Sequence, residues 1–412
     1  MRILSALAVI ALASAVAAQA QTPKADALFA QGRFVDAKKA YAAVSPKSAD
    51  YQPAMRRLGA IALFNNNLAE AERDLLIALS RDPDNKITAN LLAEVANRQG
   101  AFAKSAFWLK RAGNAPRAAA FAAFGNAMPY RITSSASGAE IRFTQTDPLP
   151  AVLARVNGKE GLFLIDTGGA EIVLDPTFAM KTGVKPVGGD KGVFAGGKSA
   201  TIAFGRIANF SIGELTVTDV PAELIPTSAL ASATKGKPVA GVIGTGLLSR
   251  FLSTIDYANA KLILAPKTSQ APKDSRAAEI PFWLLSDHLI VARGKLDNGP
   301  EQPFIVDTGL AGFAITAPRS TLRAAGIAIP QVAQQKNDAI GISAAVPFPV
   351  AAFTLGTLKA ANLQGLYGPF PPTLENGLGV HIGGIVSHQF FRPYAITFDF
   401  THMQIIVRTP KS

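Results

Sequence analysis

The sequence predicts a multidomain α and β protein, in which an N-terminal α-helical repeat precedes a mostly β region made of two similar lobes. Three observations support this prediction. The chain has 412 residues, which is too long for one ordinary core and indicates two or three domains. Residues 24–116 show helical periodicity and repeat every 34 residues. Strand-like runs separated by turn residues follow Pro129, and they form two corresponding series.

The first twenty residues have the pattern of a secretory signal peptide. Arg2 precedes an apolar stretch, and Ala18-Gln19-Ala20 supplies small residues for cleavage. We therefore expect residues 1–20 to be removed after Ala20 and the mature protein to be secreted or periplasmic. A membrane anchor is the alternative, but the stretch is short for a span of about 20 residues. Because no later segment is long and apolar enough, we expect no stable membrane insertion after cleavage.

The composition excludes several classes of chemistry. The chain has no cysteine, which excludes a thiol nucleophile, a disulfide framework and thiolate metal sites. Its four histidines lack the spacing of metal ligands, so we expect neither a metal nor an organic cofactor. The net charge is +12, but the positive residues are spread along the chain without a binding motif. We therefore expect no nucleic-acid partner.

Residues 24–125 have the spacing of repeated helical hairpins. A small residue or Asn recurs at positions 32, 66 and 100, and an apolar residue follows each two positions later. This period resembles that of the tetratricopeptide repeat, although the family's Trp and Tyr signature positions are mostly absent. Such an array could offer a groove to a peptide or partner protein, or could only support the second region. We expect Phe107 and Trp108 to be core or packing residues; a ligand-binding pair is the alternative.

Corresponding segments predict that residues 139–267 and 276–412 are two copies of one β lobe. The segments follow the same order in both halves, and each is a strand-like run bounded by turn residues. The pairs are 162–165 with 304–306, 172–174 with 313–316, 210–213 with 353–356, 241–244 with 384–387, and 255–257 with 398–400.

One short motif ends a buried strand in each lobe. Phe-Leu-Ile-Asp-Thr-Gly occupies residues 163–168, and Phe-Ile-Val-Asp-Thr-Gly occupies residues 304–309. A single Asp-Thr-Gly is commonly a turn whose Asp caps the backbone. Two copies at matching places in a repeat instead predict that Asp166 and Asp307 meet at one site. Because two carboxylates in contact cannot both ionise cheaply, they would share a proton and could activate a water molecule.

These repeated motifs resemble those of the aspartic proteases of the retropepsin and pepsin kind, over about 270 residues. The resemblance implies a two-lobed, mostly β aspartic protease domain with Asp166 and Asp307 as the catalytic pair. In this family the threonine hydroxyls bond across to the opposite loop, and the glycines allow a close backbone approach that a side chain would block. The supporting residues implied here are Thr167, Gly168, Thr308 and Gly309.

The sequence departs from the family pattern at several positions. Ser387 stands where the first lobe has a glycine. Gly169 and Leu310 replace the usual small Ala or Ser after the motif, and Ala170 and Ala311 lack the hydroxyl that often follows in pepsin-like lobes. We therefore expect the proton affinity of the pair to differ from that of a stomach-type enzyme.

Two glycine-bearing segments are candidates for flexible covers. Residues 192–198, with Gly196 and Gly197, suit the tip of a β-hairpin that folds over a peptide and excludes water. Gly341 lies in the matching interval of the second lobe. Ordinary surface hairpins are the alternative for both segments. Neither segment contains Tyr, so two such covers would be more similar to the retropepsin arrangement.

Together these features predict a secreted or periplasmic aspartic endopeptidase that hydrolyses peptide bonds with a water activated by Asp166 and Asp307. The substrate would be a polypeptide bound in extended form, and the helical repeats would recruit it or a protein partner. Both halves of the site lie in one chain, so a homodimer is not required. The main alternative is a catalytically silent peptide-binding protein with the same fold. An assembly factor that acts only through the repeats would leave the double motif unexplained.

Overall fold

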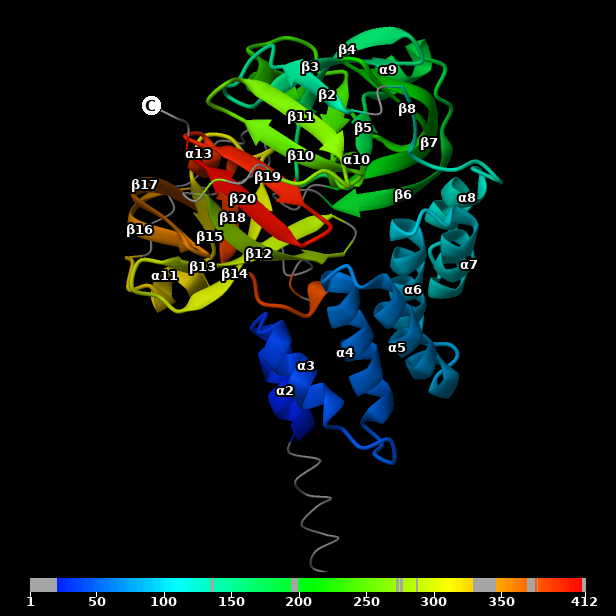
Figure 1. Cartoon of the computed structure of the whole chain (residues 1–412), viewed down its shortest axis with the longest axis vertical. Helices are drawn as coiled ribbons and strands as arrows, with labels where there is room; N and C mark the ends of the chain where they lie inside the picture. Colours follow the sequence, from blue (N-terminus) through cyan, green and yellow to red (C-terminus); the bar gives the residue numbers. More distant parts are fainter. Residues whose placement is uncertain are drawn as a thin grey trace, which may run out of the picture.

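The computed structural model has an N-terminal helical segment followed by a mostly β region with barrel-like sheets, which confirms the predicted fold class (Figure 1). No helix among the described residues is both long and apolar enough to cross a membrane. The structure describes residues 21–134, 137–193, 199–271, 274, 277–286, 288–328, 346–368, 375 and 377–409.

The helical segment is a series of hairpins whose second helices α3, α5 and α7 begin 34 residues apart. The residues at positions 32, 66 and 100 lie in the turns between the paired helices, and all three have positive φ angles, where Gly and Asn are favoured. The period in the sequence is therefore the period of the hairpins. The helices are α2 (Gln21–Ala30), α3 (Phe34–Ala42), α4 (Tyr51–Phe64), α5 (Leu68–Arg81), α6 (Lys86–Arg98), α7 (Phe102–Ala112) and α8 (Ala115–Ala122).

The first β lobe is an eight-stranded sheet in the order β1-β8-β5-β9-β4-β3-β7-β6, which curls because β8 also pairs with β7. Short helices α9 (Pro176–Lys181) and α10 (Thr245–Leu248) and the 3₁₀ helix η2 (Ser228–Thr234) connect its strands. The strands are β1 (Arg131–Ser134), β3 (Ala151–Val156), β4 (Lys159–Ile165), β5 (Ile172–Leu174), β6 (Val187–Val193), β7 (Ser199–Ile212), β8 (Leu215–Leu224) and β9 (Gly241–Ile243).

The second lobe repeats these pairings. β14 runs parallel to β18 as β4 does to β9, and β15 pairs with β18 and β17 as β5 does with β9 and β8. Helices α11 (Arg319–Ala324) and α13 (His388–Phe391) match α9 and α10. The strands are β13 (Leu289–Leu296), β14 (Glu301–Asp307), β15 (Ile315–Ala317), β16 (Val346–Leu355), β17 (Leu358–Tyr367) and β18 (Gly384–Ser387).

A continuous sheet in the order β12-β20-β19-β10-β11-β2 joins the two lobes. At its centre β10 pairs antiparallel with β19, and Thr254 lies opposite Thr397. Their buried hydroxyls are 2.7 Å apart. Since these threonines are matching residues of the repeat, a pseudo-twofold axis passes between them. The strands are β2 (Ala139–Arg142), β10 (Phe251–Asp256), β11 (Lys261–Pro266), β12 (Ala278–Leu285), β19 (Ala395–Asp399) and β20 (Gln404–Arg408).

The hairpin turns of the helical segment lie against the second lobe and the joining sheet. The Asn66 amide donates to the Phe400 carbonyl at 3.1 Å. The Arg98 guanidinium donates to the Leu284 carbonyl at 3.0 Å and to that of Ser286 at 2.5 Å. A Cβ on Gly32 would lie 2.4 Å from the Pro303 side chain, so this turn also touches β14 closely. The helical array therefore packs against the β region through the edge formed by its hairpin turns, the turn edge.

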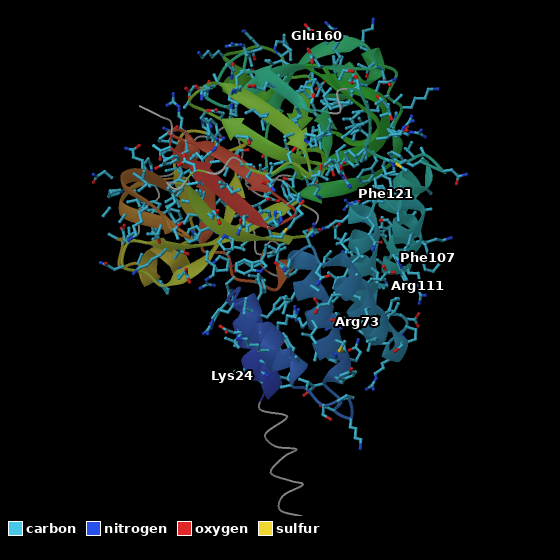
Figure 2. All side chains as sticks on the ribbon, viewed as in Figure 1. Lys24, Arg73, Phe107, Arg111, Phe121 and Glu160 are labelled. Atoms are coloured by element: carbon cyan, nitrogen blue, oxygen red, sulfur yellow. The ribbon has the colours of Figure 1, made fainter. Side chains whose placement is uncertain are left out.

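The prediction of Phe107 as a core residue is wrong, because Phe107 lies on the outward face of the array (Figure 2). Trp108 is buried as expected, but Phe107 is 54% exposed. Figure 2 shows Phe107 and Arg111 on the outer edge of the array, away from the β lobes. The buried positions of α7 include Phe102, Ala106 and Leu109. Because these recur with helical spacing, residue 107 points to the opposite side of the helix.

Phe34 lies where the helical array docks on the β region, so its substitution tests how much this docking stabilises the protein. Its fully buried ring contacts those of Phe29, Phe64 and, on β12, Trp283. We expect Phe34→Ala to lower the free energy of unfolding by about 3–5 kcal/mol, because a cavity forms between the array and the lobe. Denaturant titration would measure this. The neighbouring Val35→Ala is the control: Val35 is 61% exposed, so its loss should be under about 0.5 kcal/mol. Equal effects would contradict the docking role.

Candidate active site

Two buried strands deliver Asp166 and Asp307 to matching loops. Asp166 follows β4, and its backbone N–H donates to the Ile243 carbonyl of β9 at 3.1 Å. Asp307 ends β14, where it lies in register with Ser387 of β18. In both lobes the parallel partner strand thus fixes the backbone that carries the carboxylate. The structure brings together the two aspartates that the sequence singles out.

Reciprocal threonine bonds fasten the two loops to each other. The Thr167 N–H donates to the Thr308 hydroxyl at 3.0 Å, and the Thr308 N–H donates to the Thr167 hydroxyl at 3.0 Å. Each hydroxyl also donates across to the other lobe, Thr167 to the Val306 carbonyl at 2.9 Å and Thr308 to that of Ile165 at 3.4 Å. Both threonines are buried. These bonds link matching residues of the repeat across the pseudo-twofold axis.

The glycines of the motif bring each loop against the opposite carboxylate. A Cβ on Gly168 would lie 2.6 Å from Cγ of Asp307, and one on Gly309 would lie 2.1 Å from Cγ of Asp166. Each glycine N–H donates to the aspartate of its own loop, at 2.7 Å in the first lobe and 2.8 Å in the second. Since real side chains do not tolerate such separations, only glycine permits this arrangement.

The surroundings of Asp307 favour its protonated form. Asp307 is partly exposed as a residue, but protein atoms enclose its carboxyl group. The resulting loss of solvation is the main reason that the pKa of this carboxyl group lies well above its ordinary value. The negative charge of Asp166 and a hydrogen bond with it raise the pKa further, while the Gly309 N–H acts in the opposite direction. The pair therefore holds a proton that one isolated aspartate would release.

Ser387 is accommodated, although the matching glycine of the first lobe could not be replaced. A Cβ on Gly244 would lie 2.3 Å from the Glu171 carbonyl oxygen. Ser387, by contrast, is buried with its hydroxyl donating to the Phe313 carbonyl and accepting from the Gln389 N–H at 3.3 Å. The second lobe thus leaves room for a side chain that makes hydrogen bonds to the segment before β15 and to the start of α13.

The candidate covers are described only in part. β6 and β7 form an antiparallel hairpin up to the pair Val193 and Ser199. Gly196 and Gly197, between these strands, and Gly341 of the second lobe lie outside the described residues. The base of the hairpin lies against α8, because a Cβ on Gly188 would be 3.2 Å from the Pro116 carbonyl oxygen (Figure 1). The helical array therefore contacts this hairpin directly.

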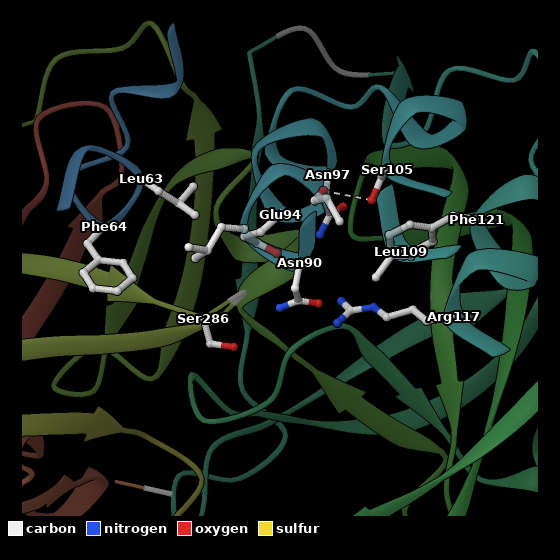
Figure 3. A pocket seen from close by; sticks show the side chains of 12 residues that line it. Leu63, Phe64, Asn90, Glu94, Asn97, Ser105, Leu109, Arg117, Phe121 and Ser286 are labelled. Atoms are coloured by element: carbon white, nitrogen blue, oxygen red, sulfur yellow. Dashed lines mark hydrogen bonds between the residues drawn. The ribbon is translucent and has the colours of Figure 1, made fainter. Parts of the chain in front are cut away.

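A small cavity of about 60 Å³ lies between the helical array and the β12–β13 turn (Figure 3). Leu63 and Phe64 of α4 form its apolar side, while Asn90 and Arg117 point into it from α6 and α8. Ser286 closes it from the β region. The loops that carry the two aspartates do not contribute to its lining, so it is separate from the candidate active site.

Sequence reasoning missed a buried cluster beside the first motif. Glu171 is buried and accepts a hydrogen bond from the Tyr130 hydroxyl. The Arg250 guanidinium lies 4.3 Å above the Tyr130 ring. These residues come from three separate segments without any recurring spacing, so no sequence pattern indicated that they would meet. Among the residues that the structure describes, no group of three or more His, Cys, Asp or Glu side chains could hold a metal ion.

Comparison with known families agrees with this architecture. Residues 152–247 match a family model described as aspartyl protease. The matched segment contains the first Asp-Thr-Gly loop and ends before the second. No curated protein sequence matches the chain significantly. The match and the barrel-like β lobes support an aspartic protease domain and a protease-type function.

Thr308→Val tests the contribution of the reciprocal bonds. The substitution keeps the shape but leaves the Thr167 N–H without its acceptor, and we expect a loss of about 1–3 kcal/mol in the free energy of unfolding. Thr321→Val is the matched control, because Thr321 is equally buried but its hydroxyl has no hydrogen-bond partner among the described residues. Denaturant titration should show almost no loss for the control. A similar loss in both variants would argue against the role of the bonds.

Asp307→Asn tests the enforced proximity of the carboxylates through the pH dependence of stability. Because the folded-state pKa of Asp307 is raised above 3.8, its contribution to stability is full below about pH 4 and is lost as pH rises through the folded pKa. Asn does not titrate, so the variant should gain stability relative to the wild type as the pH rises from about 4. Denaturant titration at a series of pH values from acid to neutral measures the difference. Glu160→Gln, at an exposed residue of the first lobe (Figure 2), should show no such trend. If the difference in the free energy of unfolding between Asp307→Asn and the wild type does not change with pH, the enforced proximity of the two carboxyl groups is refuted.

Proposed function

We propose that this protein is an aspartic endopeptidase in which Asp166 and Asp307 activate a water for attack on a peptide bond. The observation that carries the proposal is the pair of interlocked Asp-Thr-Gly loops, in which each glycine touches the opposite carboxylate. A lone turn motif needs no such arrangement. Two ionised carboxylates held together repel each other, so the pair keeps one proton between them. A pair with one shared proton can act as an acid and as a base in the same reaction.

The two carboxyl groups would take complementary roles. Asp307, whose pKa is raised by burial and by the Asp166 charge, would hold the proton and donate a hydrogen bond to the scissile carbonyl oxygen. Asp166 would accept a proton from the water as its oxygen bonds to the carbonyl carbon. Transfer of a proton to the amide nitrogen then allows the C–N bond to break, giving a carboxylic acid and an amine. No covalent bond to the protein is needed.

The substrate would be a polypeptide in extended form. An extended chain can pair its backbone with strands and place alternate side chains in pockets. The β6–β7 hairpin of the first lobe supports this proposal, since a hairpin of this kind can cover a bound chain and exclude water. The sequence pattern of residues 1–20 favours cleavage after Ala20 and a secreted or periplasmic protein.

We propose further that the helical segment is a tetratricopeptide-like array that recruits substrate or a protein partner. The 34-residue period and the positive-φ turn residues support this interpretation. The turn edge of the array already contacts the β region, through Asn66 and Arg98 among others. A partner would therefore use another face of the helices.

Proteolysis of a mixed peptide library from acid to neutral pH tests the enzymatic proposal. Mature wild-type protein should cleave peptides, and Asp166→Asn and Asp307→Asn should each lower the rate by a factor of about 10²–10⁴ or more, because each removes one half of the acid–base pair. Asp36→Asn, on α3 and paired with Arg33 at the surface, is the matched control and should cleave like the wild type. If the wild type leaves the library intact but retains peptides as tightly as the variants do, the protein is a catalytically silent peptide-binding protein.

A further inference from the structure

Tyr130 connects the helical array to the first lobe and packs beside the first motif. It lies between α8 and β1, and its side chain is buried. Its hydroxyl donates a hydrogen bond to the Glu171 carboxylate, which is also buried. Glu171 follows the Asp166 loop and directly precedes β5. The hydrogen bond therefore joins the connection from the array to the segment that carries the first motif.

The backbone of Tyr130 has a conformation that tyrosine rarely adopts. Its φ angle is 56°, in the left-handed region that favours glycine and asparagine. An aromatic residue persists at such a position only where the surrounding structure holds it there. Here the ring lies 4.3 Å from the Arg250 guanidinium, and the hydroxyl bonds to Glu171. The contacts of the side chain thus offset the backbone strain, and such strain commonly marks a functional position.

The start of helix α10 holds the first motif in place. Three hydrogen bonds run from it to carbonyl groups of the loop that carries Asp166. They join the Thr245 N–H to Gly169 at 2.9 Å, the Gly246 N–H to Ala170 at 2.7 Å and the Thr245 hydroxyl to Thr167 at 2.9 Å. A change in the position of this helix start would therefore move the loop.

The hydroxyl and carboxylate of Tyr130 and Glu171 pack directly against this helix start. A Cβ on Gly246 would lie 2.5 Å from Oε2 of Glu171 and 2.9 Å from the Tyr130 hydroxyl oxygen. The same glycine donates to the Ala170 carbonyl, on the residue before Glu171. The backbone of Gly246 is therefore enclosed by the motif segment and by the bond that Tyr130 makes to it.

The second lobe fastens its motif differently. Ser387, in the position of Gly244 of the first lobe, donates its hydroxyl to the Phe313 carbonyl. Donor and acceptor of this bond both belong to the second lobe. In the first lobe the matching segment is instead held by Tyr130, which enters from the connection to the array. The two motifs therefore differ in whether the array can affect their position.

Arg250 extends the contacts of Tyr130 to the array itself. Its guanidinium lies over the Tyr130 ring and 3.5 Å from the Arg98 carbonyl oxygen at the end of α6. The Arg98 side chain in turn donates to the Leu284 carbonyl of β12 at 3.0 Å. The ring of Tyr130 is thus held between the array side of the molecule and the first motif.

We propose that Tyr130 and Glu171 are positioning residues of the candidate active site, which hold the Asp166 loop against α10 and so fix the Asp166 carboxylate relative to Asp307. The proposal rests on the proposed function, because positioning matters for catalysis only if the pair is catalytic. Neither residue belongs to a motif. They act through the backbone of the loop and not on the substrate.

Tyr130→Phe tests this role, because it removes the hydroxyl and keeps the ring beside Arg250. We expect kcat for a cleaved peptide to fall about 5- to 30-fold, since a small displacement of one carboxylate impairs a pair that must act together. KM should change by less than about twofold, because the parts that would bind the substrate are unchanged.

Tyr41→Phe is the matched control. Tyr41 is also buried, and its hydroxyl also donates to a carboxylate, that of Asp26, but within the helical array. Its kcat and KM should match those of the wild type. An equal loss of kcat in both variants would show a general effect of removing a buried hydroxyl and would overturn the positioning role of Tyr130.

Substitutions of Glu171 show whether the two residues act as one unit. Glu171→Gln keeps an acceptor for the Tyr130 hydroxyl and should retain kcat within about threefold. Glu171→Ala should lose at least as much as Tyr130→Phe. Combining Glu171→Ala with Tyr130→Phe should add no further loss, because both remove the same hydrogen bond. Losses that add would contradict an action of Tyr130 through Glu171.

Amide hydrogen exchange keeps this inference separate from the proposed function. In Tyr130→Phe, residues 166–171 and 243–248 should exchange about tenfold faster or more, while residues 358–367 of β17 exchange as in the wild type. Faster exchange at the first motif in a protein that cleaves no peptide would support the positioning role and overturn the enzymatic proposal. Unchanged exchange at the first motif would overturn the positioning role, whether or not peptides are cleaved. If Tyr130→Phe fails to fold, Glu171→Ala is compared with Glu171→Gln, and equal exchange in these two variants would overturn it.

Discussion

The structure of the candidate site depends on the reciprocal bonds between Thr167 and Thr308. Two carboxylates close together repel each other once both ionise, and burial adds a desolvation penalty. Something must offset that cost, and here it is a set of buried hydrogen bonds that join the two lobes at their matching residues. Because every bond crosses from one lobe to the other, neither lobe can move at this point without leaving a buried polar group unpaired.

The joining sheet extends this constraint away from the site. Thr254 and Thr397, which are matching residues of the repeat like the motif threonines, also meet between the lobes. Two contacts between matching residues define a line, so the relative orientation of the lobes is fixed around it. The relative position of the two carboxylates therefore also depends on a sheet that contains none of the motif residues. This is how a duplicated lobe can build one site from two loops.

Much of this arrangement could be predicted from the sequence, because it is periodic. The hairpin turns follow from residues at 34-residue intervals, and the meeting of Asp166 and Asp307 follows from a motif repeated at matching places. The same reasoning applied residue by residue would have placed Phe107 on the exposed face of α7, since buried Phe102 and Leu109 have helical spacing. Residue 107 lies between these buried positions on the other side of the helix, so its ring is exposed despite its aromatic character.

Other features could not be predicted, because they arise where segments without shared periodicity meet. Nothing in the local sequence of Asn66 or Arg98 indicates that each would bond to a backbone carbonyl of the β region. The same holds for Glu171 and Tyr130, which are 41 residues apart and belong to different elements. Likewise, Ser387 is unfavourable by comparison with the first lobe, yet its hydroxyl bonds to the Phe313 carbonyl of a separate segment. Only the packed structure decides such cases.

The helical array contacts both lobes, and this has a mechanical consequence. Its first hairpin turn touches β14 of the second lobe through Gly32, while α8 lies against β6 of the first lobe near Gly188. Between these ends, Arg98 bonds to the joining sheet, and the Arg250 guanidinium of the first lobe lies 3.5 Å from the Arg98 carbonyl oxygen. A stack of packed helices resists bending, since each hairpin buries its apolar face against the next. If the β6–β7 hairpin moves relative to the second lobe, it must either break contacts at one end of the array or bend the array itself. The helices therefore restrict how the parts around the candidate site can move relative to each other.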